Sequence, residues 1–303
     1  MASTVAGESL TPTDEYTVLV AVGNPGTAEQ LTRTAVDLAR ANDGRVHVVS
    51  VIHKHHTSPF LLFSDERIKQ QFAGGRDEIV DSATSVAADA GVPVDDTLLV
   101  GSDIARSITT AIDRLDADLA LLGWRSERRA SDVVLGTTID PVVRRAHCDV
   151  LVEKVGPTAD GVASVLVPTV GGVHAELATE VAGAIAAAND ARVTALSLVG
   201  AEATERERTD AAEAVDAVAD ALEGTAPVTT TVREAADPVA GILSAAADHD
   251  LVVLGATRKG LFARKIVGTT PRAVGSRADC PVIVASRESQ LSRIRRLVTN
   301  VWR

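Results

Sequence analysis

The chain carries one segment twice, at residues 123–152 and again at 255–284. Each copy reads as a strand, a glycine-bounded loop, a Gly-Thr-Thr triplet, a helix and a closing strand. The copies match at a constant offset of 132, where Gly123, Gly136, Thr137, Thr138 and Cys148 correspond to Gly255, Gly268, Thr269, Thr270 and Cys280. Self-similarity at this spacing predicts two domains of one architecture, which a length of 303 residues accommodates.

Both halves alternate short apolar runs with segments of helical periodicity. The first half opens with YTVLVAV at 16–22 and the second with VLVPTVGG at 165–172. Later in each half, Asp103 and Asp237 are expected helix N-caps, and Pro238 suits a first helical position. Continuous apolar strands separated by helices require a parallel sheet covered on both faces. The predicted fold class is therefore α/β, with two doubly wound, Rossmann-like parallel-sheet domains in tandem, related by a pseudo-two-fold.

The predicted organisation has five parts. We expect a disordered leader at 1–15, a first domain at 16–153, a linker at 154–163, a second domain at 164–286 and a basic amphipathic tail at 287–303. The first domain has extra residues between its second and third strands.

Composition narrows the class of protein. The net charge is −11, 46% of residues are hydrophobic and only 2% are aromatic. Such a chain forms globular domains with aliphatic cores, and over most of its surface it would repel nucleic acid. No apolar run is long enough to span a bilayer, and the N-terminus lacks the apolar region of a signal peptide. We therefore expect an acidic cytoplasmic protein whose two cysteines are reduced core residues.

The loop inside the second copy is the best candidate for a ligand site. A strand ends at Gly255, and the chain returns to Gly268, Thr269 and Thr270 before Pro271 starts a helix. Free N–H groups at a helix N-terminus favour an anion. Basic residues in the same loop add positive charge, namely Arg258, Lys259, Arg264 and Lys265. These residues fit a phosphate cradle, but the glycines and threonines would also serve simply to cap a helix.

The opening VLVPTVGG, the closing LGATRKGLFARKIVGTTPRAVGSRADCPVIVA and the five-strand alternation resemble a tandem pair of universal stress protein domains. The resemblance implies the adenine nucleotide alpha hydrolase-like fold, with domains that often pair through their last strands. Many members bind ATP through a Gly-x2-Gly-x9-Gly-Ser/Thr loop and an Asp that ends the first strand. The resemblance thus implies ATP or another adenine nucleotide in the second domain, held by Thr169, Val170, Gly255, Thr257, Arg258, Gly260, Gly268, Thr269 and Thr270.

Both halves depart from that signature. Arg258 stands at the middle glycine position in the second half, where Gly260 supplies a nearby glycine, and Ser126 stands there in the first. The first-strand Asp corresponds to Val170 and to Gly23. We therefore expect the second domain to be the ligand-binding half and the first to be mainly structural.

A second function stays open. The Gly-Asn-Pro turn at 23–25 and the Gly-Trp-Arg at 123–125 resemble stress-protein domains attached to, or encoded beside, amino-acid and cation transporters. The tail at 287–303 has five Arg and one Glu, with apolar residues at helical spacing. Such a helix binds a membrane surface or a partner, or docks on an acidic face of its own domain. The alternative is a protein-binding accessory module of a membrane transporter, with no nucleotide bound.

No constellation of catalytic residues stands out. His147 and His174 lack counterparts in the other half, and no serine lies in a nucleophile-elbow pattern. His53, His55, His56 and Asp65 lack the spacing of a metal site. We expect a non-catalytic regulator that binds an adenine nucleotide and no metal, with slow ATP hydrolysis and homodimerisation left open.

Overall fold

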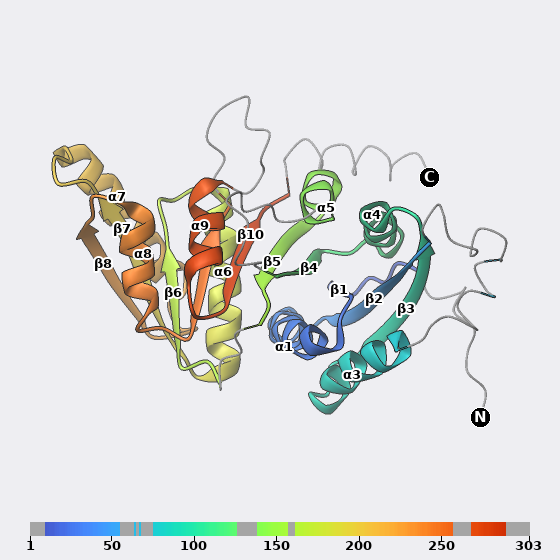
Figure 1. Cartoon of the computed structure of the whole chain (residues 1–303). Coiled ribbons are helices and arrows are strands. Elements are labelled where there is room, and N and C mark those ends of the chain that lie inside the picture. The colour runs from blue at the N-terminus through green and yellow to red at the C-terminus, as the bar shows by residue number, and fades with distance from the viewer. Residues whose placement is uncertain are drawn as a thin grey trace, which may run out of the picture. The chain divides into compact units, whose positions relative to one another are not determined.

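The computed structural model describes residues 10–54, 64, 67, 75–125, 138–156, 161–256 and 268–288, and Figure 1 shows the ribbon. Predictions about the His55–Phe63 region, most of the two loops and the C-terminal tail lie outside these residues. Every strand pairing that has a defined register is parallel, as the continuous apolar strands predict.

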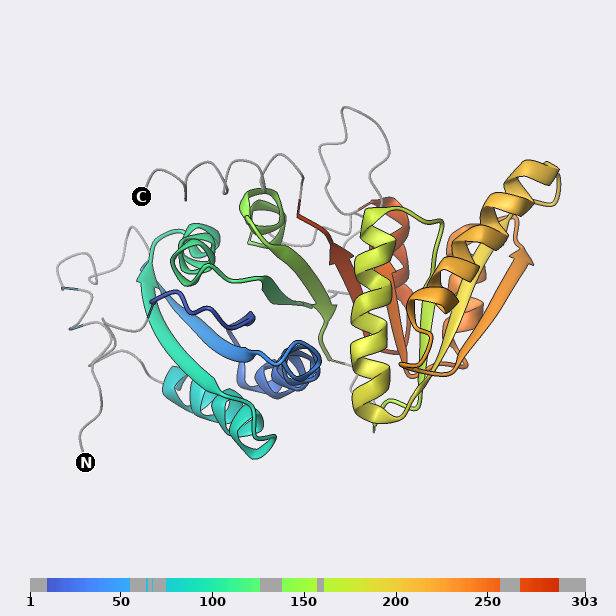
Figure 2. The ribbon, with the colours of Figure 1, turned by 180° about the vertical axis from the view of Figure 1, so that it is seen from behind.

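In the first half, the sheet order is β3-β2-β1-β4-β5. The strands are β1 (Thr17–Val22), β2 (Arg45–His53), β3 (Val94–Gly101), β4 (Leu119–Trp124) and β5 (Asp149–Lys154). The helices are α1 (Pro25–Ala41), α3 (Arg76–Asp89), α4 (Ile104–Leu115) and α5 (Ile139–Arg145). Figures 1 and 2 show α1 and α3 on one face of these strands and α4 and α5 on the other.

The second half repeats this winding in the order β10-β9-β6-β7-β8. The strands are β6 (Ser164–Pro168), β7 (Arg192–Val199), β8 (Val228–Glu234), β9 (Leu251–Gly255) and β10 (Val282–Ser286). The helices are α6 (Val173–Asn189), α7 (Glu205–Ala221), α8 (Pro238–Ala246) and α9 (Thr269–Arg277). Helices α6 and α7 cover one face, and α8 and α9 cover the other (Figures 1 and 2). In both halves the winding reverses between the first and fourth strands.

Short polar residues begin the helices where the sequence predicts them. The Asp103 carboxylate accepts from the Arg106 N–H at 3.0 Å, and the Asp237 carboxylate accepts from the Val239 N–H at 2.9 Å. Pro238 occupies the first position of α8. Both predicted N-caps are confirmed. Helix α9, in contrast, starts at Thr269, two residues before the predicted start at Pro271. Proline is tolerated in this first turn, because the N–H groups there have no intrahelical acceptors to lose.

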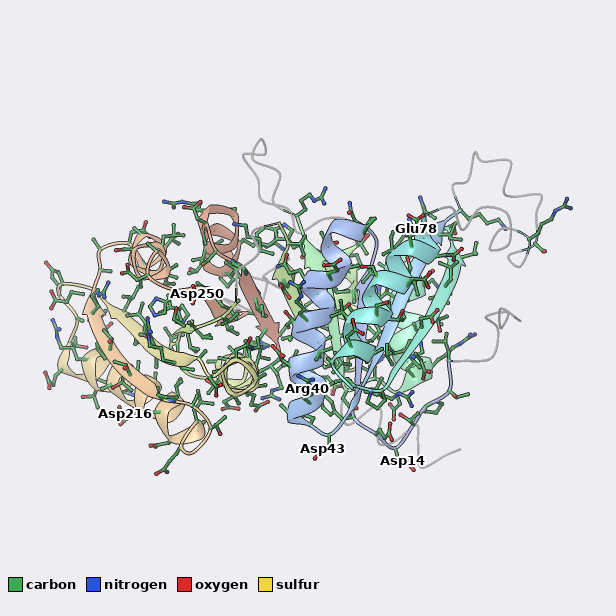
Figure 3. All side chains as sticks on the ribbon, turned by 90° about the horizontal axis from the view of Figure 1, so that it is seen from below. Asp14, Arg40, Asp43, Glu78, Asp216 and Asp250 are labelled. Atoms are coloured by element: carbon green, nitrogen blue, oxygen red, sulfur yellow. The ribbon has the colours of Figure 1, made fainter. Side chains whose placement is uncertain are left out.

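An aspartate holds the amino end of the first strand in each half. Asp118 accepts from the Thr17 N–H at 2.9 Å. Its counterpart Asp250, labelled in Figure 3, accepts at 2.9 Å from each of three donors, the Ala163 N–H, the Ser164 N–H and the Ser164 hydroxyl. Burial tends to raise the pKa of Asp250, but these hydrogen bonds and the charge of Arg192 outweigh it, so the pKa is lowered overall.

The chain divides into two compact units that do not coincide with the two repeats. One unit comprises residues 1–123, 136–150 and 288–303, and the other comprises 124–135 and 151–287. Within the second unit, Trp124 is 3% exposed and its carbonyl accepts from the Val155 N–H at 2.8 Å. A Cβ atom at Gly275 of α9 would lie 2.2 Å from the Trp124 ring. The glycine is therefore needed for packing.

Candidate functional site

The carboxyl ends of β6 and β9 meet at the point where the winding of the second half reverses. These strands pair in parallel through Val165 with Leu251, so their carboxyl ends lie at one edge of the sheet. Thr169 and Val170 follow β6 at this edge, and Gly255 ends β9. In doubly wound sheets this is the place where ligands bind. The structure thus brings three of the sequence-predicted site residues to the expected edge.

The turn after β6 presents an apolar side chain to solvent. The Thr169 hydroxyl is buried and accepts from the Gly171 N–H at 3.1 Å. Gly171 and Gly172 have φ values of +75° and +90°, which a residue with a Cβ rarely adopts. Between them and Thr169, Val170 is 76% exposed. A valine left this open at the expected ligand edge is available for contact with an apolar ring.

The N-terminus of α9 offers backbone donors. Gly268 precedes the helix without a side-chain cap, and Thr269 and Thr270 are its first two residues. The Arg272 N–H closes the first turn on the Gly268 carbonyl at 3.4 Å. The N–H groups of Thr269 and Thr270 have no intrahelical acceptors, which is the arrangement that favours an anion. Thr257, Arg258 and Gly260, which belong to the same predicted site, lie outside the described residues.

Gly255 has a structural reason to be glycine. A Cβ atom at this position would lie 2.7 Å from the backbone carbonyl carbon of His174, at the start of α6. Close packing of β9 against α6 therefore requires glycine whether or not a ligand binds. The presence of glycine at position 255 therefore says little about a ligand.

A cavity of about 460 Å³ opens beside this edge, between the end of β7 and the start of α7. It is lined by Val170, Ser197, Leu198, Val199, Gly200, Glu202, Ala203, Glu207, Asp210 and Ala211. Three of these residues carry carboxylates and none carries a positive charge. The Glu207 pKa is lowered by hydrogen bonds from the Thr204 N–H and hydroxyl, which form a capping box at α7. The cavity therefore presents hydrogen-bond acceptors.

Ser197 on β7 points into the cavity. The residue is 2% exposed, and no partner for its hydroxyl is found among the residues that the structure describes. The hydroxyl oxygen itself is not a buried atom, so it is open to the cavity and can bond to water or to a ligand there.

The first half fills the corresponding place with an arginine. Strand registers make Ser50 on β2 the counterpart of Ser197 on β7. Val22 of β1 lies opposite Ser50, and continuing the β6–β7 register by one residue beyond the Pro168–Leu196 pair places Thr169 opposite Ser197. The Arg76 guanidinium, on α3, donates to the Ser50 hydroxyl at 3.1 Å. Its partial burial lowers the pKa of Arg76, although the group stays charged at neutral pH.

The replacement of Arg76 can be followed along the helices. The two helices bury residues in the same spacing. These are Ile79, Val80, Ala83 and Ala87 in α3, and Ala214, Val215 and Val218 in α7 together with its C-cap residue Leu222. Matching these positions places Ala211 where Arg76 stands. A small side chain in α7 therefore leaves open the space that a long one crosses in α3. The two halves thus differ in structure at this place.

Sequence reasoning missed Ser197, Asp210 and Ala211. A partial signal for Ser197 exists, because Ser50 and Ser197 are polar residues at equivalent positions of two largely apolar strands, as are His47 and Thr194. Finding the cavity, however, also requires knowing which residue of the next helix faces that serine. The difference between Arg76 and Ala211 becomes meaningful only when the helices are placed on the sheet.

No helix in the described ranges is both long and apolar enough to cross a bilayer. Over the same ranges, no three metal-ligating side chains gather in a way that would hold an ion. Cys148 and Cys280 are both free; Cys148 is buried, as predicted for a core residue, whereas Cys280 is half-buried, and burial raises the pKa of Cys280.

Comparison with known proteins agrees with this architecture. A relative from Staphylococcus saprophyticus, described as a universal stress protein, is 30% identical over 138 residues, which cover 45% of this chain and 82% of the relative. A Pseudomonas aeruginosa crystal structure, also described as a universal stress protein, has a TM-score of 0.65 at 16% identity, covering 94% of this chain and 98% of that one.

The cytoplasmic domain of a prokaryotic cation chloride cotransporter shares the fold too, with a TM-score of 0.56 at 13% identity and 92% and 99% coverage of the two chains. The sequence model of the universal stress protein family matches residues 16–154 and 162–286. The chain therefore belongs to the universal stress protein family, with two such domains in tandem.

Proposed function

We propose that the second half binds an adenine nucleotide and that the protein acts by this binding rather than by catalysis. The phosphates would lie at the N-terminus of α9, against the N–H groups of Thr269 and Thr270. The nucleoside would extend over Val170 toward the β7–α7 cavity. Membership of the universal stress protein family supports a regulatory role of this kind.

One observation carries the proposal. In the second half, helix donors that lack intrahelical acceptors and an acceptor-lined cavity of about 460 Å³ lie at the same sheet edge. A nucleotide needs an anion site at one end and hydrogen-bond acceptors for amino and hydroxyl groups at the other. In the first half, Arg76 already bonds to the equivalent serine, and α5 is a shorter helix. We therefore propose the second half as the binding half.

Isothermal titration with ATP, ADP and AMP tests this function. G268E places a carboxylate at the N-cap of α9, where it should repel phosphate and take up the free N–H groups. We expect ATP affinity to fall at least about tenfold, which corresponds to about 1.4 kcal/mol. The matched variant G136E alters the equivalent position of the first half and should leave ATP affinity unchanged.

The proposal fails if ATP, ADP and AMP do not bind at millimolar concentration, or if G268E and G136E affect binding equally. Release of inorganic phosphate from ATP, followed over the same titration, checks the second part of the proposal. We expect no turnover above the background of buffer alone. Sustained phosphate release that is lost in G268E would instead assign an ATPase.

The alternative function is that of a transporter accessory module. The fold likeness to the cytoplasmic domain of a cation chloride cotransporter, with a TM-score of 0.56, favours it, as does valine at the position of the nucleotide-binding Asp. On this alternative, deleting residues 288–303 should remove the protein from the membrane fraction of its host lysate. Equal membrane sedimentation of both forms would count against it.

A further inference from the structure

We propose that a groove between the end of β3 and helix α4, in the first half, binds a small ligand that carries an anionic group at each end. Arg106 and Arg114 of α4 would hold the two anionic groups, and hydroxyl groups between them would bond to the body of the ligand. A sugar bisphosphate has this chemistry. Every residue that lines the groove belongs to the first half, so the inference stands apart from the nucleotide proposed for the second half.

The groove has a volume of about 350 Å³, which lies within the range of small-molecule sites. It is walled by Leu99 at the end of β3, by Leu10 from the segment before β1, and by one stripe of α4. The stripe consists of Arg106, Thr110 and Arg114, which are spaced four residues apart. A rise of 1.5 Å per residue separates the Cα atoms of the two arginines by about 12 Å and places Thr110 halfway between them. The stripe therefore has an arginine at each end.

Positive charge predominates in the groove. Asp103 is the one acidic residue in the lining, and its carboxylate caps α4 by accepting from the Arg106 N–H at 3.0 Å. In the part of the chain that the structure describes, no ion pair involves the guanidinium of Arg106 or Arg114, although the chain has a net charge of −11. Guanidinium groups bind phosphate or carboxylate oxygens through paired N–H donors. Two such groups, one at each end of the stripe, fit a ligand with two anionic ends.

Close packing fixes the floor of the groove where β3 meets α4. The Ser107 hydroxyl donates to the Asp103 carbonyl at 3.0 Å, and a Cβ atom at Gly101 would lie 2.2 Å from the Ser107 oxygen. The Gly101 backbone therefore approaches α4 more closely than a residue with a side chain could. The hydroxyls of Ser102 and Thr110 also line the groove and can bond to hydroxyl groups of a ligand.

The second half does not repeat this stripe. Counting from the N-cap of each helix, Ala240 of α8 takes the position of Arg106. The position of Arg114 falls on Asp248, beyond the end of α8. A neutral and an acidic residue at these positions would not hold two anionic groups, so the site is assigned to the first half alone.

Isothermal titration of the full-length protein with fructose 1,6-bisphosphate, fructose 6-phosphate and fructose tests the inference. We expect the bisphosphate to bind at least about tenfold more tightly than the monophosphate, and fructose not to bind. R106A and R114A should each lower affinity for the bisphosphate at least about tenfold and lower affinity for the monophosphate less. The matched control R33A removes an exposed arginine from α1, on the other face of the sheet, and should leave these affinities unchanged.

The inference is overturned if the bisphosphate does not bind at millimolar concentration or if the bisphosphate and the monophosphate bind equally. Equal losses in R33A and R106A would also overturn it, because they would indicate general attraction between charges. ATP separates this site from the proposed function. G268E should lower ATP affinity and leave bisphosphate affinity unchanged, whereas R106A should do the reverse. If ATP does not bind but the bisphosphate binds in an R106A-sensitive way, the groove stands and the nucleotide function fails.

Discussion

Replacing Asp250 by alanine should destabilise the second half more than the equivalent change destabilises the first. Asp250 accepts hydrogen bonds from the Ala163 N–H, the Ser164 N–H and the Ser164 hydroxyl, each at 2.9 Å. Asp118 accepts one from the Thr17 N–H at 2.9 Å. Hydrogen bonds to charged groups contribute about 1.5–3 kcal/mol when buried, and both aspartates are partly exposed, so about 1 kcal/mol each is appropriate. We therefore expect D250A to cost about 3 kcal/mol and D118A about 1 kcal/mol.

The same contact should make the stability of β6 depend on acid. The pKa of Asp250 is lowered in the folded protein, so the unfolded chain binds a proton more readily. The contribution of Asp250 is then fully present above the unfolded pKa of about 3.9 and is lost as pH falls below it. D250N keeps an acceptor oxygen but not the charge. It should cost less than D250A and remove this part of the acid dependence.

Hydrogen exchange of the peptide that spans 163–168, with thermal unfolding followed by circular dichroism, measures these effects. The amides of Ala163 and Ser164 donate directly to Asp250, so they should lose protection first in D250A and, in the native protein, as the pH falls below the unfolded pKa of Asp250. The apparent melting temperature of D250A should fall by about 6–12 °C, at roughly 2–4 °C per kcal/mol. Equal losses in D250A and D118A, or unchanged protection of β6 in D250A, would refute the reasoning.

Two further predictions concern buried contacts. His47 is 2% exposed and bonded to Thr97 at 2.9 Å, and burial lowers its pKa to about 4. As the pH falls, His47 is protonated in the unfolded chain before it is protonated in the folded protein. The free energy of unfolding should therefore decline by about 3 kcal/mol between pH 6.5 and 4. Urea titrations should show a flatter decline for H47N. G275A should cost about 1–3 kcal/mol, because the new methyl group overlaps the Trp124 ring. W124L should relieve that cost, and a G275A protein as stable as the original would contradict the packing.

Local patterns predict much of this fold because each depends on neighbouring residues. Asp103 and Asp237 cap helices through N–H groups two or three residues ahead, and the apolar strands need only their own composition to be placed in a parallel sheet. The cavity is different. Whether the strand serine faces a space or a side chain depends on the residue that the covering helix places over it. Arg76 of α3 contacts Ser50, whereas α7 places Ala211 near Ser197, and such contacts join residues far apart in the sequence. Gly255 is the opposite case. The sequence suggests that it contacts a ligand, but the structure shows that glycine is needed there for close packing against α6.

The hydrogen bond from Arg76 to Ser50 bears on how the protein would respond to changing ligand concentration. In the first half, the space over Ser50 is occupied by the Arg76 side chain. In the second half, the equivalent space over Ser197 is an open cavity. A duplicated domain would otherwise provide two sites and the means for one to sense the other. Here each chain should titrate as a single independent site, with a hyperbolic curve and a Hill coefficient of about 1. If the second half binds a nucleotide as proposed, a single site of this kind would report ligand concentration in graded fashion across roughly two decades.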